Sequence, residues 1–303
     1  MTKEGFVNLD GVKLHYLDWG GTGKPLVLLT GLGATAKYYG GLAPKLAKRF
    51  KVLGLTRRGH GRSDRPAECN LDYFVEDIHH YLDAMEIEQA ILVGHSMAGY
   101  EMPLFAIRYP QRVEAIICMD ANYQKMDSEP DFSDDPTNGL PSIEQTPDDF
   151  ASLDAYFAYY KKARPDWARI WCKAIEEDLL EYVKISDDGR IEETRDSEFF
   201  SRIWKEIEPH YPEYEKVKCP ILAITPVGHY HPGVPLDTSE DIQKAANKYW
   251  QERVLPFIQE TIKSFRQSAP TAHIVELDTP NHRVFLAKED ETVRAIFDFL
   301  PTT

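Results

Sequence analysis

Short apolar runs recur through the first part of this 303-residue chain, separated by polar, turn-forming residues. The runs at 26–30 (LVLLT), 51–56 (KVLGLT), 90–93 (AILV) and 113–119 (VEAIICM) are typical of buried strands. Residues 12–19 (VKLHYLDW) alternate between apolar and polar side chains, as a strand with one exposed face does. The pattern therefore predicts a strand at each of these positions.

Helices are expected between these strands. They should lie near 38–48, over about 71–85, and from the stretch GHSMAG to about Arg108, with Asn70 placed to cap the second of them. Continuous apolar strands that alternate with helices indicate a mostly parallel sheet covered by helices on both faces. Residues 1–125 should therefore form the first part of an α/β core.

This alternation stops in the middle of the chain. Residues 121–146 are rich in Pro, Asp and Ser, and three helical stretches follow near 147–163, 166–185 and 196–208, with no strand expected between them. We therefore expect residues 126–214 to form a helical cap that is inserted into the core.

Strands and helices alternate again over residues 215–303, which should form the second part of the core. Strands are predicted at 219–225 and 273–277, and helices over about 238–267 and 287–299. The whole chain is thus expected to be an α/β core interrupted by a helical insertion.

The apolar stripes of the predicted cap helices are unusually aromatic. Side chains three or four positions apart share one face of a helix, so these rings line up along each helix. Some of them should pack the cap, and others should face a substrate pocket. The candidates for the pocket are Tyr156, Tyr160, Trp167, Trp171 and Trp204.

One serine lies where a strand is expected to turn sharply into a helix. Ser96 follows the strand at 90–93, and the small residues Gly94 and Ala98 lie two positions on either side of it. Such a turn needs unusual backbone angles and small neighbours, and it exposes its central side chain above the sheet edge. Ser96 is therefore the predicted nucleophile.

A serine hydroxyl needs a base to become a nucleophile. In this architecture the base lies in the loop after the last strand, which places His282 of the stretch TPNH in that role. His229 and His231, in a loop rich in Pro and Gly, are weaker alternatives. His95 is next to the serine in sequence but should point away from it.

Acyl transfer also needs donors for the oxyanion that develops on the substrate. One candidate is the backbone N–H of Met97, directly after the nucleophile. The other is the N–H of Leu32, in the loop after the strand at 26–30, where Gly31 permits the bend.

The acid that orients the base is the least usual feature of the sequence. The loop after the strand at 219–225 contains no carboxylate before Asp237, which should instead cap the helix that begins near 238. The strand at 113–119 is followed at once by Asp120. Asp120 is therefore the predicted acid, with Asp237 as the alternative, and the order Ser96, Asp120, His282 matches nucleophile, acid and base.

These stretches carry a resemblance to a known family. LDGVKLHYLDWG, TGLG, RRGHGRSDRP, GHSMAG and PNHRVFL together resemble the α/β-hydrolase superfamily, in particular its capped, esterase-like members. The resemblance covers about 1–125 and 215–303. It implies the α/β-hydrolase fold, with the roles given above for Ser96, His282, Leu32 and Met97.

Two positions refine this resemblance. Relatives usually carry histidine where this chain has Thr30, a departure that should affect packing below the oxyanion hole more than the donors. Haloalkane dehalogenases and epoxide hydrolases resemble this core but use aspartate at the elbow, so Ser96 argues against both.

Charge and composition narrow the possible partners. The net charge of −14 argues against a nucleic-acid partner. Residues 126–214 hold 23 Asp and Glu against 10 Lys and Arg, so a pocket mouth built from them should disfavour anions. No apolar stretch is long enough to span a membrane, and the N-terminal residues lack a signal-peptide core, so we expect a cytoplasmic protein. The four scattered cysteines predict neither disulfides nor a metal site, and no cofactor is expected.

The sequence therefore favours a serine hydrolase that cleaves a carboxylic ester or lactone with an apolar or aromatic group. A non-catalytic ligand receptor on the same fold is an alternative, and so is a hydrolase of carbon–carbon bonds. The sequence does not indicate an oligomeric state.

Overall fold

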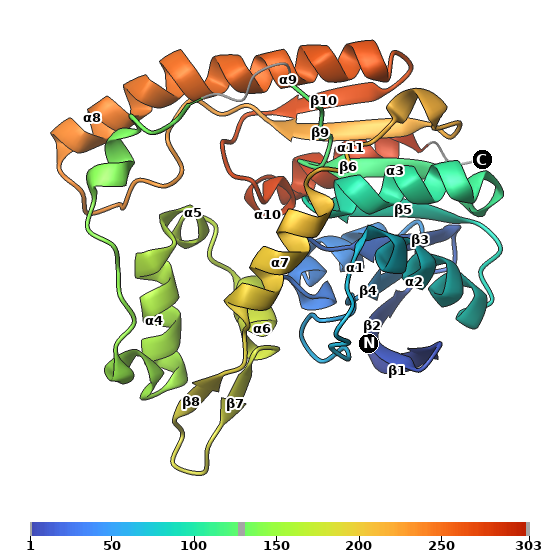
Figure 1. Ribbon diagram of the computed structural model, residues 1–303, viewed down its shortest axis with the longest axis horizontal. Coiled ribbons are helices and arrows are strands. Elements are labelled where there is room, and N and C mark those ends of the chain that lie inside the picture. The colour runs from blue at the N-terminus through green and yellow to red at the C-terminus, as the bar shows by residue number, and fades with distance from the viewer. Residues whose placement is uncertain (1, 127–130, 301–303) are drawn as a thin grey trace.

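The computed structural model describes residues 2–126 and 131–300, and in them eight strands form one sheet (Figure 1). Their order across the sheet is β1-β2-β4-β3-β5-β6-β9-β10. β1 and β2 are antiparallel to each other, and β2 is antiparallel to β4, whereas all the other neighbours are parallel. The strands are β1 (Lys3–Leu9), β2 (Val12–Gly20), β3 (Pro25–Leu29), β4 (Lys51–Leu55), β5 (Ala90–His95), β6 (Val113–Met119), β9 (Ile221–Pro226) and β10 (His273–Leu277).

Helices cover both faces of this sheet, which confirms the predicted fold class. Side chains of α2 (Leu71–Ala84), α3 (Ala98–Arg108) and α9 (Leu255–Ser268) pack on one face. Side chains of α1 (Leu42–Leu46), α10 (Val284–Ala287) and α11 (Glu289–Phe299) pack on the other. Alternate residues of β3 enter the two clusters, Leu26 and Leu28 on one side and Val27 and Leu29 on the other, because successive strand side chains point to opposite faces.

The predicted elements of the core lie close to the observed ones, with a few differences. Asn70 caps α2 by accepting a hydrogen bond from the backbone N–H of Tyr73, as expected. β1 was not predicted. The helix expected near 38–48 is instead a 3-10 helix at Ala36–Tyr39 followed by α1, and Gly40 and Gly41 separate the two. Glycine is unfavourable inside a helix, which accounts for the break.

The segment between β6 and β9 contains strands, so the prediction that it is purely helical was wrong. Its described elements are 3-10 helices at Pro136–Gly139 and Pro147–Phe150, α4 (Leu153–Ala163), α5 (Pro165–Ala168), α6 (Lys173–Leu180), β7 (Val183–Ile185), β8 (Ile191–Glu193), α7 (Ser197–Ile207) and a 3-10 helix at Tyr214–Lys216. The helix expected at 166–185 is thus two short helices and a strand. The turn between β7 and β8 contains Gly189 with a φ of 84°, which glycine tolerates. Residues 127–130 of the expected cap, and 301–303 of the expected second core part, lie outside the described residues.

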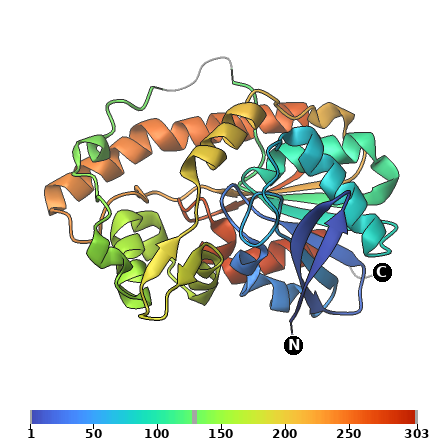
Figure 2. The same cartoon turned by 60° about the horizontal axis from the view of Figure 1, so that its bottom comes forward.

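The helix expected over 238–267 is present as α8 (Glu240–Tyr249), a π-helical turn at Trp250–Val254, and α9. Its N-cap is Ser239, so the expectation that Asp237 caps it was wrong. Figures 1 and 2 show α8 and α9 as one long rod beside β10, with α8 reaching past the sheet on the side of the inserted segment. Among the described residues no helix combines the length and the apolarity that crossing a bilayer requires.

A close contact fixes the start of α3 against the end of β6. A Cβ atom placed on Gly99 would lie 1.9 Å from the backbone carbonyl oxygen of Ala121. Only glycine therefore lets the two backbones approach this closely. The contact sets the spacing between Ser96, just before α3, and Asp120, just after β6.

Gly99→Ala is expected to lower the free energy of unfolding by about 1–3 kcal/mol, because the added methyl group overpacks a rigid backbone contact. Urea unfolding followed by circular dichroism measures this. Gly139→Ala is the matched control, since a Cβ there meets nothing within 4 Å. Equal unfolding midpoints for the two variants would contradict the argument.

Candidate active site

Ser96 lies at the turn between β5 and α3 and has a φ of 52°, in the left-handed region. Its surroundings are crowded. A Cβ on Gly94 would lie 2.4 Å from the Cβ of Ala98, and a Cβ on Gly31 would lie 3.0 Å from the Cβ of Ser96. A strained turn with small neighbours is the geometry of a nucleophile elbow.

The structure brings Asp120 and His282 together. Asp120 directly follows β6 and has a φ of 47°, and His282 lies in the loop between β10 and α10. The Nδ1 atom of His282 is 2.6 Å from the Oδ2 atom of Asp120. Because this contact occupies Nδ1, Nε2 is the ring nitrogen of His282 that remains available to take a proton.

The alternative residues lie elsewhere. Asp237 is exposed in the turn before α8 and makes no hydrogen bond to His282. His229 is exposed, whereas the Nε2 atom of His231 is 2.9 Å from the Oδ2 atom of Asp135. Asp120 is therefore the carboxylate that orients His282 in this structure.

His95 supports the loop that holds His282. Its ring lies 4.4 Å from the ring of His282, and its Nε2 atom donates a hydrogen bond of 2.9 Å to the backbone carbonyl of His282. Burial holds the pKa of His95 well below its usual value, and the neighbouring His282 lowers it further. His95 is therefore a neutral donor that fixes the position of the next histidine.

Sequence reasoning missed Tyr123. Its hydroxyl oxygen is 3.3 Å from the Oγ atom of Ser96, and its ring stacks on that of Tyr100 with centroids 4.5 Å apart. Burial raises the pKa of Tyr123, so the phenol stays protonated and is able to donate to Ser96. The one sequence signal was its position three residues after Asp120, which places it at the same strand end.

The loop that carries Leu32 is anchored on the core side by a buried ion pair. Arg57, two residues after the end of β4, donates hydrogen bonds to the carbonyl oxygen and the hydroxyl of Thr30 and also pairs with Glu101 of α3. Both charged side chains are 2% exposed. In the described part of the chain, the N–H groups of Leu32 and Met97 donate to no other protein group, which leaves them free for a ligand.

The inserted segment holds the same loop from the other side. Arg195 donates a hydrogen bond of 2.7 Å to the carbonyl oxygen of Gly33. Asp178 of α6 accepts hydrogen bonds from the backbone N–H and the hydroxyl of Thr35, at 2.6 and 2.8 Å. Burial raises the pKa of Asp178 to about 6, and Arg195 opposes this shift. The loop is therefore fixed between the core and the inserted segment.

A cavity of about 750 Å³ contains Asp120, Tyr123 and His282 in its lining. It lies between α3 and α7 on one side and the π-helical turn and α9 on the other. Seven aromatic side chains line it: Tyr100, Tyr123, Phe132, Trp204, Tyr211, Trp250 and Phe257. The size and the apolar lining are typical of a small-molecule site.

The five aromatic residues expected in the pocket separate into three groups. Trp204 lines the cavity of about 750 Å³, and Tyr160 and Trp167 line a smaller one of about 240 Å³ that includes Leu32. Tyr156 and Trp171 line neither, so the expectation for these two was wrong. The hydroxyl of Tyr156 donates to Glu193 and the Nε1 atom of Trp171 to Glu176, so both pack the inserted segment itself.

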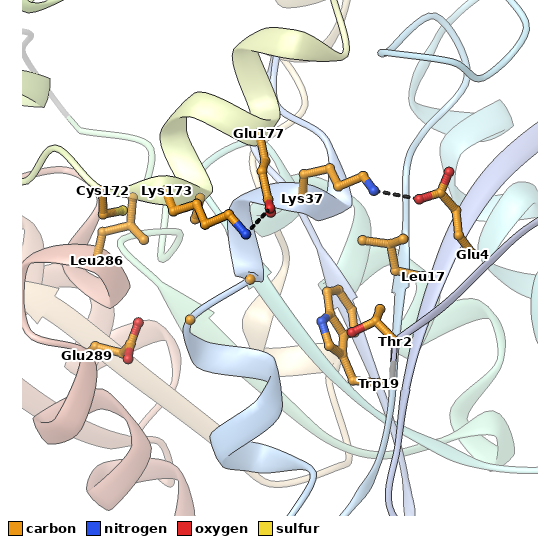
Figure 3. A pocket seen from close by; sticks show the side chains of 13 residues that line it. Thr2, Glu4, Leu17, Trp19, Lys37, Cys172, Lys173, Glu177, Leu286 and Glu289 are labelled. Atoms are coloured by element: carbon orange, nitrogen blue, oxygen red, sulfur yellow. Dashed lines mark hydrogen bonds and ion pairs between the residues drawn. The ribbon is translucent and has the colours of Figure 1, made fainter.

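A separate cavity of about 490 Å³ lies between β2, the 3-10 helix at Ala36–Tyr39 and α6 (Figure 3). Its charges are paired, Lys37 with Glu4 and Lys173 with Glu177, and none of the candidate catalytic residues lines it. In residues 2–126 and 131–300 no group of three or more His, Cys, Asp or Glu side chains is arranged to hold a metal ion.

Asp120→Asn is expected to lower kcat for an ester by about four orders of magnitude, because an amide favours the wrong tautomer of His282, as in the serine-protease triad. The loss is measured with p-nitrophenyl butyrate on protein whose circular dichroism is unchanged. Asp237→Asn is the control and should keep the wild-type rate. The reverse pattern would transfer the acid to Asp237.

Parts of this chain are similar in sequence or in structure to known proteins. A family model described as the alpha/beta hydrolase fold matches residues 24–157, which include Ser96 and Asp120. An uncharacterized protein of Mycobacterium tuberculosis is 33% identical over 102 residues, or 33% of this chain and 30% of that protein. The 2-hydroxymuconate semialdehyde hydrolase of a Pseudomonas species is 37% identical over 114 residues, 36% of this chain and 40% of that enzyme.

The chain thus spans less than half the length of these curated relatives. A solved structure covers far more of it. The crystal structure of E-2-(acetamidomethylene)succinate hydrolase aligns with 99% of this chain and 99% of its own, with a TM-score of 0.73 and 19% sequence identity. The mostly parallel sheet, the family match over residues 24–157 and this structural likeness show that the chain has the α/β-hydrolase fold.

Proposed function

We propose that this protein is a serine hydrolase that cleaves a carboxylic ester or lactone with an apolar or aromatic group through an acyl-enzyme. The observation that carries the proposal is the 2.6 Å contact between His282 and Asp120. Both residues line the cavity together with Tyr123, whose hydroxyl oxygen is 3.3 Å from the Oγ atom of Ser96. A nucleophile, a base and an orienting carboxylate in one place are what acyl transfer needs.

In the acylation step, Nε2 of His282 takes the proton of the Ser96 hydroxyl while Oγ attacks the ester carbonyl carbon. The carbonyl electron pair moves onto its oxygen and forms the tetrahedral intermediate. When this collapses, the bond to the alcohol oxygen breaks, and His282 gives its proton to the departing alcohol. Asp120 stabilises the imidazolium between these two transfers.

Deacylation repeats the sequence with water as the nucleophile. His282 takes a proton from water, and the hydroxide attacks the acyl carbon. The bond to Oγ then breaks, and His282 returns the proton to Ser96. One ester bond and one water are consumed, and one acid and one alcohol are released, so no co-reactant is needed.

The N–H groups of Leu32 and Met97 are proposed to hold the oxyanion in both steps. Such donors contribute most when their positions are fixed before the reaction, because they then need no reorganisation. The anchoring of the Thr30–Thr35 loop by Arg57, Asp178 and Arg195 supplies this rigidity.

Tyr123 has a place in this scheme. In this scheme its hydroxyl is the donor to one lone pair of Ser96 Oγ, which leaves the Ser96 proton free to point at Nε2 of His282. The same donor lies beside Oγ when this atom becomes the leaving group in deacylation. Tyr123 would thus stabilise the negative charge that forms on Oγ at that moment.

Ser96→Ala should lower kcat for p-nitrophenyl butyrate by about three to six orders of magnitude, because triad members act as a unit. A fluorophosphonate probe should label the wild-type protein and fail to label this variant. Ser201→Ala, an exposed serine on α7, is the control and should keep both turnover and labelling.

Retention of ester turnover by Ser96→Ala would refute the nucleophile. If the wild-type protein binds small ligands in the cavity but neither turns over esters nor reacts with the probe, the receptor alternative holds instead. Turnover of ketone substrates with wild-type labelling, but no turnover of esters, would favour the carbon–carbon hydrolase.

A further inference from the structure

The lining of the cavity of about 750 Å³ contains acidic side chains that no described lysine or arginine of the lining balances. Among the described residues that line it are three carboxylates, Asp120, Asp166 and Glu208, and no lysine or arginine. A hydrolase for an anionic substrate would need a cation in this lining, since an anion facing only carboxylates is repelled.

Only one of these carboxylates lacks a partner in the described residues. Asp120 is held by His282, and Asp166 is paired with Arg164 and Arg283 at 3.2 Å. Glu208, by contrast, makes no ion pair and no side-chain hydrogen bond with a described residue, and it is solvent-exposed. Glu208 thus leaves one uncompensated negative charge at the mouth of the cavity.

Aromatic side chains line the same cavity as Glu208. Glu208 follows Trp204 by four positions at the end of α7, so both side chains share one helix face, and both line the cavity. The ring of Tyr100 lies 5.9 Å from that of Trp204 and 6.5 Å from that of Tyr211. Glu208 lines the same cavity as Tyr100 and Tyr211.

This wall reaches the candidate nucleophile. The ring of Tyr123 lies 6.2 Å from that of Trp204, while its hydroxyl is 3.3 Å from the Oγ atom of Ser96. A group bound against Trp204 would therefore belong to the same small substrate whose carbonyl meets Ser96.

We propose that this aromatic wall, formed by Tyr100, Tyr123, Trp204 and Tyr211 with Glu208 at its edge, binds a quaternary or tertiary ammonium group of the substrate. Tryptophan and tyrosine faces attract such cations, which lose little on leaving water because their methyl groups are weakly hydrated. This inference rests on the proposed function and names its substrate class: an ester whose alcohol or acyl part carries an alkylammonium group a few bonds from the carbonyl.

Three compounds of nearly the same shape separate charge from size. Choline, 3,3-dimethylbutan-1-ol and isethionate share a hydroxyethyl arm and carry a positive, a neutral and a negative tetrahedral head. Their dissociation constants are measured by isothermal titration calorimetry on Ser96→Ala, so that the readout does not depend on turnover. The dissociation constant of choline is expected to be about one fifth of that of the neutral alcohol or lower, in line with a cation–π contact at a partly exposed site. Isethionate is expected to bind most weakly of the three.

Substitutions at two positions test where the cation binds. Glu208→Gln, combined with Ser96→Ala, should reduce the preference for choline over the neutral alcohol by about half or more, because the uncharged amide removes the Coulomb attraction. Trp204→Leu should reduce it as well, and Trp204→Phe, which keeps a ring, should restore part of it. Glu206→Gln is the matched control on the same helix, since Glu206 is exposed and does not line this cavity.

The inference is overturned if the neutral alcohol or isethionate binds as tightly as choline, or if none of the three binds at tens of millimolar. It is also overturned if the preference for choline survives both Glu208→Gln and Trp204→Leu, because the cation then binds elsewhere. Failure here is separable from failure of the proposed function: turnover of p-nitrophenyl butyrate that depends on Ser96 would stand without any preference for a cation.

Discussion

The loop from Thr30 to Thr35 is held between two sets of buried or half-buried charged groups, and the rest of the site depends on this. Arg57 and Glu101 hold it from the core, and Asp178 and Arg195 hold it from the inserted segment. Removing one partner of a buried ion pair leaves an uncompensated charge and typically costs about 3–5 kcal/mol. The loop therefore cannot move without breaking contacts that are costly to lose, and the N–H of Leu32 keeps its place beside the Ser96 turn.

The same contacts join the core and the inserted segment around the Thr30–Thr35 loop. Glu101 lies in α3, the helix that begins just after Ser96, so the Arg57–Glu101 pair connects the Ser96 turn to the Thr30–Thr35 loop. Asp178 and Arg195 tie the inserted segment to that same loop. Gly99 then sets the separation between the Ser96 turn and Asp120 through its contact with Ala121. The segment that contributes Trp204 and Glu208 to the cavity is thus held to the Thr30–Thr35 loop by hydrogen bonds.

Much of this could be predicted from the sequence because local rules carry it. β6 and β10 have the predicted bounds, since continuous apolar runs flanked by turns leave few alternatives. The choice of Asp120 followed from the lack of a carboxylate in the loop after β9. The β7–β8 hairpin was missed because its strands have three residues each, too few to show a period.

Other features depend on contacts between residues that are far apart in the chain. Such contacts could not be predicted from one sequence. Glu193 of β8 accepts the hydroxyl groups of Tyr156 and Tyr160, which directs these rings toward the hairpin and leaves Tyr156 outside the cavity. The pairing of Arg57 with Glu101 joins positions 44 residues apart, and Tyr123 meets Ser96 across 27. Side-chain orientation in the inserted segment is set by such partners, whereas the position of Ser96 is set by its immediate neighbours.

The central claim is that Ser96 carries the acyl group during turnover, and trapping that species tests it most directly. The wild-type protein is mixed with p-nitrophenyl acetate, quenched in acid within the first turnovers, digested and analysed by peptide mass spectrometry. The account predicts one acetyl group on Ser96, together with a burst of p-nitrophenol equal to the enzyme concentration. Steady turnover with no acetylated peptide, or acetylation at a residue other than Ser96, would contradict it.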